Sequence, residues 1–308
     1  MRRREFCLSV GASALGFPGS SLGATPKSSE LEVHDLKLDG DAKIARRALL
    51  LVPPQRSGER PLRVLVLLHG LGETGNELLG IHAWGERYGL VSSYERLRAP
   101  PVVRALPKLR YFTDEHLAEV NASLTRRPFA GLALLCPVTP NPYKLQPAAK
   151  TLDRYAEWLV TKALPAARNK APLGVGPEFV GLDGCSLGGY VGMEVFLRRP
   201  EAFGSFGGVQ SAFGGPQGIA YARRLAEAIR RVGPRALRFG TSSEDPYRKA
   251  NQALSQELHA LDVPHTLSVL PGPHNQPWLR EVGTLDMLLW HERQLGVPRP
   301  PHRAFDMR

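Results

Sequence analysis

The sequence predicts an α/β fold in which helices cover both faces of a doubly wound, mostly parallel β-sheet. Short apolar runs typical of buried strands alternate with helix-length segments along most of the chain. Glycine- and proline-rich turns close several of these runs at their carboxyl ends, where the active groups of such sheets gather. The 308 residues, 43% of them hydrophobic and 22% charged, suffice for one large globular domain.

The first two strands, 31–38 and 45–52, are expected to pair antiparallel at the edge of the sheet. The run 63–69 is almost continuously apolar, which is typical of a strand buried on both faces. A helix is expected over 152–164, with Thr151 as its N-cap. Further strands are expected at 132–136, 178–183, 206–209, 236–240 and 265–270, and further helices after residue 186 and at 219–232, 247–261 and 278–295.

Residues 97–130 depart from this alternation. They contain Pro100-Pro101, Tyr111-Phe112 and a short stretch with helical character at 114–124. An excursion of this length between sheet strands is often a lid or a pocket wall, and a surface insertion without function is the alternative.

The two chain ends are expected to lie outside the fold. Residues 1–24 have the layout of a cleaved export signal, with Arg2-Arg3-Arg4, a weakly apolar middle and small residues up to Ala24. The run Arg3-Arg4-Glu5-Phe6-Cys7-Leu8 resembles a twin-arginine signal, which predicts a periplasmic or secreted protein. A disordered basic start on a cytosolic protein is the alternative. The remaining segments are a linker at 25–30, a single α/β domain at 31–297 and a loose tail at 298–308.

The formal net charge of +11 comes from basic residues that are scattered in pairs such as Arg46-Arg47 and Arg223-Arg224. No nucleic-acid-binding motif accompanies these pairs, so a basic surface without a nucleic-acid partner is expected. No apolar run reaches the length of a membrane span, and stable membrane insertion is therefore not expected.

The cysteines do not indicate a disulfide scaffold. Cys7 lies in the expected signal, Cys136 ends one predicted strand, and Cys185 follows another. If those two strands flank a common neighbour, they are about 9.6 Å apart at ~4.8 Å per strand step. A disulfide requires Cα atoms closer than ~7 Å, so Cys136 and Cys185 are expected to be free, buried thiols.

The segment Gly184-Cys185-Ser186-Leu187-Gly188 is a Gly-x-Ser-x-Gly pattern between a predicted buried strand and a helix. A serine on such a sharp turn is held in strained backbone geometry, and the two glycines leave room where the turn is tight. The hydroxyl of Ser186 is therefore expected to stand clear of the sheet edge as a nucleophile.

A serine nucleophile needs a base to take its proton, and the base needs an acid to orient it. His274 follows the last predicted strand in the turn Pro271-Gly272-Pro273-His274 and is the candidate base. The acid is expected after the strand 236–240, where Asp245 is favoured and Glu244 is the competitor. An acidic residue at this point would equally cap the following helix.

The oxyanion of an acyl-transfer reaction needs two hydrogen-bond donors. One is expected to be the backbone N–H of Leu187, which directly follows the nucleophile at a helix N-terminus. The other is expected from the loop after the strand 63–69, as the backbone N–H of Leu71 between two glycines. His69 ends that strand and is expected to brace the loop instead of acting as a base.

The motif set resembles the α/β-hydrolase superfamily through Leu67-Leu68-His69-Gly70-Leu71-Gly72, Gly184-Cys185-Ser186-Leu187-Gly188-Gly189, Glu244-Asp245-Pro246-Tyr247 and Leu270-Pro271-Gly272-Pro273-His274. Within it, residues 45–295 are most similar to an esterase group that includes esterase D (S-formylglutathione hydrolase), feruloyl esterase and antigen 85-like members. The resemblance implies an α/β-hydrolase fold with about eight strands, and neither a metal nor a cofactor. That group often carries Gly-Gly-His-Asp around the base, where this chain has Gly272-Pro273-His274-Asn275.

These residues predict a serine esterase that cleaves carboxylic esters through an acyl-enzyme on Ser186. The substrate is expected to be a small-molecule or polymer-linked ester bound by Trp84, Tyr143, Gln210 and Trp278, with simple packing as the alternative for the aromatic residues. Two other functions stay open. One is an acyltransferase in which an alcohol replaces water, and the other is a non-catalytic binding protein on a hydrolase scaffold.

Overall fold

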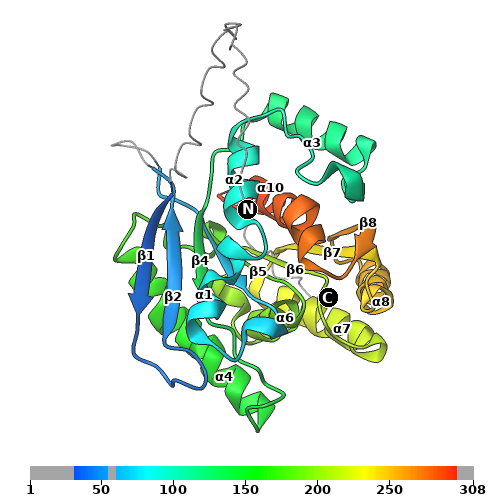
Figure 1. Cartoon of the computed structure of the whole chain (residues 1–308). Helices are drawn as coiled ribbons and strands as arrows, with labels where there is room; N and C mark the ends of the chain where they lie inside the picture. Colours follow the sequence, from blue (N-terminus) through cyan, green and yellow to red (C-terminus); the bar gives the residue numbers. More distant parts are fainter. Residues whose placement is uncertain (1–30, 55–59, 297–308) are drawn as a thin grey trace, which may run out of the picture. The chain divides into compact units, whose positions relative to one another are not determined.

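The computed structural model of the chain describes residues 31–54 and 60–296 (Figure 1). The expected export signal, linker and C-terminal tail lie outside these residues, as does Cys7, so the division of the chain and its export stay predictions. Within the described ranges, no helix combines the length and the apolar character needed to cross a membrane.

The strands are β1 (Glu32–Lys37), β2 (Arg47–Val52), β3 (Val64–Leu68), β4 (Ala133–Pro137), β5 (Val180–Gly184), β6 (Ser205–Val209), β7 (Ala236–Glu244) and β8 (Thr266–Pro273). They form one sheet in the order β1-β2-β4-β3-β5-β6-β7-β8 (Figure 1). The pairs β1–β2 and β2–β4 are antiparallel and the others are parallel, which confirms the predicted fold class. The expectation that both β1 and β2 are edge strands is wrong for β2, which pairs with β1 on one side and with β4 on the other.

The helices are α1 (Glu77–Glu86), α2 (Leu90–Arg98), α3 (Asp114–Arg126), α4 (Ala148–Trp158), α5 (Leu164–Arg168), α6 (Leu187–Arg198), α7 (Gly215–Val232), α8 (Arg248–Ala260), α9 (Gln276–Trp278) and α10 (Thr284–Gln294). π-helical turns at Leu159–Ala163 and Leu279–Gly283 join α4 to α5 and α9 to α10. The expected N-cap at Thr151 is wrong. Helix α4 begins at Ala148, and the hydroxyl of Thr151 donates to the carbonyl of Leu145 at 3.0 Å.

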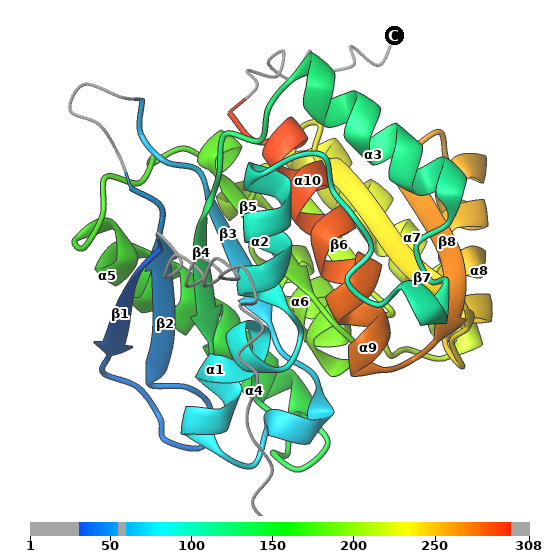
Figure 2. The same ribbon diagram turned by 45° about the horizontal axis from the view of Figure 1, so that its top comes forward.

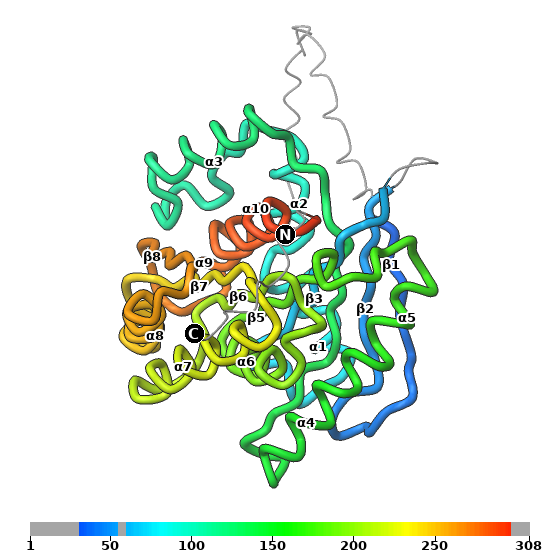
Figure 3. The backbone as a smooth tube through the Cα atoms, turned by 180° about the vertical axis from the view of Figure 1, so that it is seen from behind, coloured from blue at the N-terminus to red at the C-terminus, as the bar shows by residue number. Residues whose placement is uncertain are grey.

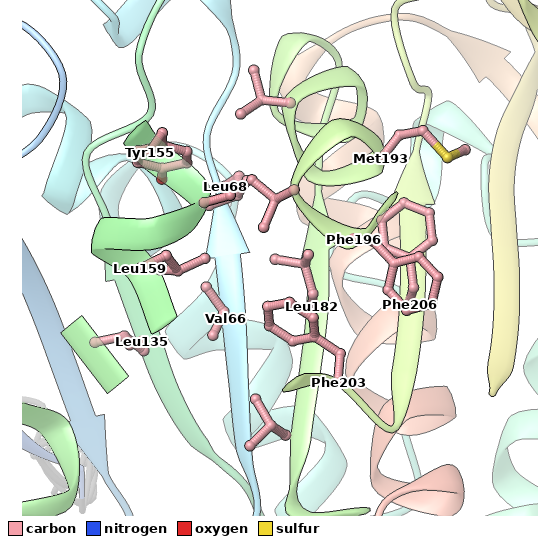
Figure 4. Packing of buried hydrophobic residues seen from close by; sticks show 14 of the residues in the cluster. Val66, Leu68, Leu135, Tyr155, Leu159, Leu182, Met193, Phe196, Phe203 and Phe206 are labelled. Atoms are coloured by element: carbon pink, nitrogen blue, oxygen red, sulfur yellow. The ribbon is translucent and has the colours of Figure 1, made fainter. Parts of the chain in front are cut away.

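Side chains of β3 alternate between two hydrophobic cores on opposite faces of the sheet, as the two-residue repeat of a strand requires. Val64, Val66 and Leu68 pack with α4, α6, α7 and α8, and Figure 4 shows part of this core. Leu65 and Leu67 pack with α1, α2, α3 and α10 on the other face. Figure 2 shows α2, α3 and α10 in front of the strands, and Figure 3 gives the view from behind.

The thiols of Cys136 and Cys185 are free and buried, as predicted. Cys136 lies in β4, and Cys185 directly follows β5. These two strands flank β3, so the geometric premise of the prediction also holds.

A buried polar chain ties α10 to the centre of the sheet. Nε2 of His291 donates to the Asp183 carboxylate at 2.9 Å, and the Ser205 hydroxyl donates to Nδ1 of the same ring at 2.9 Å. None of the three residues is exposed to solvent. Because burial lowers the pKa of His291, the ring stays neutral, and its tautomer is set by the carboxylate, which only accepts hydrogen bonds.

The excursion 97–130 packs against the segment that leads from the His274 turn into α10. The buried carboxylate of Glu281 accepts the backbone N–H groups of Ala105 at 3.1 Å and Leu106 at 2.5 Å. Further along, the ring of Tyr111 lies so close to Gly272 that a Cβ there would come within 2.7 Å of it. The excursion therefore touches the turn that carries the candidate base, and its role as a pocket wall stays a prediction.

Helix α3 of the excursion is held by His116, whose Nε2 lies 3.2 Å from the carboxylate of Asp286. Burial alone would lower the pKa of His116, but the hydrogen bond to Asp286 and its negative charge outweigh burial and the nearby Arg238, so the pKa is raised. Asp286 is ionised, since its pKa is held well below the usual range by Arg238 and His116 in spite of burial.

Replacing His116 with glutamine is therefore expected to destabilise the protein more at about pH 5 than at about pH 9. A raised pKa in the folded state gives a stabilising contribution that is complete below the unfolded-state pKa of about 6.5. That contribution disappears as the pH rises through the folded-state pKa. Urea unfolding of both proteins at the two pH values measures it. His82→Gln is the control, since the exposed pair of His82 with Glu86 contributes little at either pH. An equal deficit at both pH values for His116→Gln would contradict the assignment.

Candidate active site

Ser186 occupies the sharp turn between β5 and α6, with a positive φ of 55° and a ψ of −117°. A non-glycine residue in this region is strained, and such strain is concentrated at functional sites. The turn is closely packed. A Cβ at Gly188 would lie 2.1 Å from the carbonyl oxygen of Leu68, and one at Gly184 would lie 2.4 Å from the backbone of Gly188. Only glycine fits these two positions, as the motif predicts.

The structure joins the three residues predicted for the triad in one hydrogen-bonded chain. Nδ1 of His274 lies 3.0 Å from the Asp245 carboxylate, and Nε2 lies 3.0 Å from the Ser186 hydroxyl. A carboxylate only accepts, so Nδ1 carries the proton and Nε2 is left free to accept the proton of the serine. Ser186 is partly exposed and the His274 side chain is 25% exposed, so a substrate can reach both.

The carboxylate of Asp245 is fully buried and has a donor for each oxygen. Oδ1 accepts the N–H of Tyr247 at 3.0 Å in addition to His274, and Oδ2 accepts the hydroxyl of Thr241 at 2.6 Å. Glu244 is exposed to solvent. The structure thus places Asp245, and not Glu244, beside His274. Thr241 is a partner that the sequence analysis missed, because β7 was expected to end at Gly240 and instead continues to Glu244.

The turn that carries His274 is held by the side chains of Gln210 and Asn275. The side-chain amide of Gln210 donates to the carbonyl of Pro273 at 3.1 Å and to the hydroxyl of Ser242 at 2.6 Å. The side chain of Asn275 accepts the N–H of Trp278 at 2.9 Å and caps α9. An aspartate is frequent after the histidine in the resembled group, and Asn275 caps the helix here as an aspartate would.

The backbone N–H groups of Leu71 and Leu187 lie at the first residues of two helical turns, where amides have no partner within the helix. Across the described residues, neither of these N–H groups donates to another protein atom. The loop after β3 packs against the turn of Ser186, since a Cβ at Gly188 would also lie 2.7 Å from the carbonyl of His69. The two segments that carry these unpaired amides therefore touch each other beside Ser186.

His69 is fully buried and braces this loop, as the sequence analysis expected. Its Nε2 accepts the N–H of Thr139 at 2.9 Å, and its Nδ1 therefore donates to the carbonyl of Gly70 at 2.9 Å. Burial lowers the pKa of His69 to about 4, opposed by the Gly70 bond, so the ring is neutral at pH 7. The Gly70 carbonyl and the Leu71 N–H belong to one planar peptide, and so the ring also sets the direction of that N–H.

Three of the four residues expected to bind substrate do not face solvent. Trp84 and Trp278 are 0% and 1% exposed within the hydrophobic core, so the expectation that they line an open pocket is wrong and packing accounts for them. Gln210 is 2% exposed and supports the His274 turn instead. Tyr143 is 62% exposed and stacks on Tyr190 with ring centroids 5.8 Å apart. It is the one of the four that is open to a ligand.

In the described ranges, no group of three or more His, Cys, Asp or Glu side chains is arranged to hold a metal ion.

Comparison with solved structures finds the same fold in several esterases. A ferulic acid esterase superposes with a TM-score of 0.62 at 15% identity, over 86% of this chain and 98% of that chain. An S-formylglutathione hydrolase from Staphylococcus aureus gives 0.57 at 14% identity, over 85% and 98%. The feruloyl esterase module from Clostridium thermocellum, complexed with sinapinate, gives 0.55 at 14% identity, over 90% and 94%. No model of a protein family and no curated protein matches the sequence. The likeness establishes the α/β-hydrolase fold.

Proposed function

We propose that the protein is a serine esterase that hydrolyses carboxylic esters through an acyl-enzyme on Ser186. The observation that carries this proposal is the unbroken chain from the Ser186 hydroxyl through His274 to Asp245, with 3.0 Å at both steps. It is supported by the names of the structural neighbours, which include feruloyl esterase and S-formylglutathione hydrolase.

In the first half-reaction, Nε2 of His274 takes the proton of Ser186 as its oxygen attacks the ester carbonyl. The carbonyl oxygen becomes an anion that the Leu71 and Leu187 amides stabilise. His274 then gives its proton to the leaving alcohol, and the serine remains acylated. Asp245 keeps the ring in the tautomer that this transfer requires.

In the second half-reaction, the unprotonated Nε2 of His274 activates a water molecule, which attacks the acyl carbon. The carboxylic acid leaves and the Ser186 hydroxyl is restored. The substrate is a small-molecule or polymer-linked ester, and the exposed ring of Tyr143 is available to contact it.

An acyltransferase would use the same first half-reaction and replace water with an alcohol in the second. Hydrolysis is favoured because the neighbours are named as esterases and hydrolases. Product analysis with a p-nitrophenyl ester and excess glycerol separates the two activities, since transfer would yield the glyceryl ester at the expense of the free acid.

If Ser186 is the nucleophile, a fluorophosphonate probe is expected to label the native protein once, on the peptide that contains Ser186. Mass spectrometry of the digested, labelled protein locates the adduct, and heat-unfolded protein is the control because it lacks the triad geometry. Absence of labelling, or labelling of a different residue, would overturn the serine mechanism and favour the binding-protein alternative.

A further inference from the structure

The loop that carries the Leu71 amide contains a buried hydrogen-bond relay that the proposed mechanism does not use. The hydroxyl of Tyr88, between α1 and α2, accepts the backbone N–H of Gly70 at 3.2 Å and donates to the carboxylate of Glu73. Tyr88 and Glu73 are 4% and 2% exposed. The Tyr88 hydroxyl is thus hydrogen-bonded both to Gly70, which precedes Leu71, and to Glu73, which lies two residues after it.

Burying a carboxylate is unfavourable unless strong partners compensate for the lost hydration. The cation nearest to Glu73 is Arg87, at 3.5 Å and on a 40% exposed side chain, so the hydroxyl of Tyr88 is the closer partner. Burial raises the pKa of Tyr88 far above its usual value, so the hydroxyl keeps its proton and remains a donor. Packing of the ring against Trp84 explains why the ring is buried, but it does not require the hydroxyl.

Gly70 needs external restraint more than other residues do, because it has no Cβ and its backbone angles are soft. Its carbonyl is held by His69, as described above, and its N–H is held by Tyr88. With both groups fixed, the peptide between Gly70 and Leu71 has one orientation, and the Leu71 N–H points in one direction. Loss of either restraint would let this peptide rotate.

We propose that Tyr88 and Glu73 are positioning residues for the oxyanion donor at Leu71. The inference rests on the proposed function, because it concerns the donor used in the Ser186 reaction. Neither side chain touches the substrate. Each acts through the backbone of Gly70 and Leu71, and the effect is therefore expected in the transition state and not in substrate binding.

The test is Tyr88→Phe, which removes the hydroxyl and keeps the ring. With p-nitrophenyl butyrate, kcat is expected to fall about 10- to 100-fold with KM changed less than about two-fold, somewhat less than for complete loss of an oxyanion donor. Affinity for phenylboronic acid, which forms a tetrahedral adduct with the serine, is expected to fall in parallel with kcat/KM.

Tyr94→Phe is the matched control. Tyr94 is also 4% exposed, and its hydroxyl accepts the N–H of Leu132 at 3.2 Å and donates to the carbonyl of the same residue at 3.3 Å. Tyr94 lies in α2 and belongs to neither the triad nor the oxyanion loop. Its removal is expected to lower thermal stability about as much as Tyr88→Phe does and to leave kcat within about two-fold.

The double variant Tyr88→Phe/Glu73→Gln separates positioning from simple damage. The single change leaves a buried carboxylate without its donor, and glutamine removes that charge, so stability is expected to recover. The Gly70 N–H still lacks an acceptor, so kcat is expected to stay low. Recovery of kcat together with stability would overturn the proposal.

Glu73→Leu removes the acceptor of the Tyr88 hydroxyl and is expected to lower kcat about 10-fold with KM changed less than about two-fold, whereas Glu73→Gln restores an acceptor and is expected to recover part of that loss. Wild-type kcat in Tyr88→Phe, with Ser186 still labelled by fluorophosphonate, would overturn the positioning role and leave the esterase proposal intact. Failure of the wild-type protein to react at Ser186 would overturn the esterase proposal itself.

Discussion

Replacing Ser186 with alanine is expected to lower kcat for ester hydrolysis by about 10⁵- to 10⁶-fold while the protein stays folded. Nε2 of His274, now 3.0 Å from the serine oxygen, would have no hydroxyl to deprotonate, and no acyl-enzyme would form. Residual turnover would come from water activated by the histidine and from the oxyanion amides. Initial rates with p-nitrophenyl acetate and the absence of an acylation burst measure the effect.

The protein supplies its own control, because Ser205, His291 and Asp183 form a second Ser–His–Asp chain. Its hydrogen bonds, both 2.9 Å, are as short as those of the triad, but all three residues are fully buried. Ser205→Ala is expected to lower stability by about 1–2 kcal/mol and to leave kcat within about two-fold. A loss of activity equal to that of Ser186→Ala would contradict the assignment of the nucleophile.

These two hydrogen-bonded sets show that a serine, a histidine and an aspartate in contact do not by themselves identify a nucleophile. Ser205 lies within β6 in extended structure, whereas Ser186 has a positive φ in the turn that follows β5. The turn lifts the hydroxyl out of the sheet to a place that a substrate can reach. The Gly-x-Ser-x-Gly pattern encodes this difference in backbone geometry, and it is the sequence signal on which the proposal of Ser186 as the nucleophile rests.

Elements governed by local patterns were predicted well. The apolar run 63–69 leaves no polar face for solvent, and it forms the doubly buried strand β3. Helix α1 was missed, because polar and apolar residues are mixed around it, although Asn76 caps it by accepting the Leu79 N–H at 3.0 Å. The extension of β7 depends on its pairing with β8 as far as Glu244 and Pro273, which no local pattern encodes.

The residues proposed for the triad could be named from the sequence, because each follows a strand at the same edge of the sheet. Their supports could not. Gln210 reaches Pro273 across 63 residues of sequence, and nothing near either residue indicates the contact. The prediction that two tryptophans bind substrate fails for a similar reason. The sequence around an aromatic residue beside a loop looks the same whether the residue lies in a core or in a pocket. Trp84 and Trp278 are in the core.

Replacing Asp245 with asparagine is expected to lower kcat by about 10⁴-fold at neutral pH with little change in KM. Asparagine keeps the size of the side chain, but its amide group can donate to Nδ1 of His274 and so stabilise the tautomer with the proton on Nε2. A ring in that tautomer cannot accept the proton of Ser186. Steady-state kinetics with p-nitrophenyl acetate, together with thermal unfolding, separates this loss from misfolding.

Glu244→Gln decides between the two acids that the sequence left in competition. Glu244 is exposed at the end of β7, so its replacement is expected to leave kcat within about two-fold. Thr241→Val is expected to lower kcat about 10-fold, a loss between those of Glu244→Gln and Asp245→Asn. Asp245 would keep its His274 and Tyr247 partners and lose the 2.6 Å hydrogen bond that holds its second oxygen. A 10⁴-fold loss in Glu244→Gln with near-normal Asp245→Asn would require the His274 turn to adopt a different arrangement in solution. The buried carboxylate of Asp245 argues against that outcome, since moving His274 away would leave its Oδ1 with the N–H of Tyr247 as its one remaining donor.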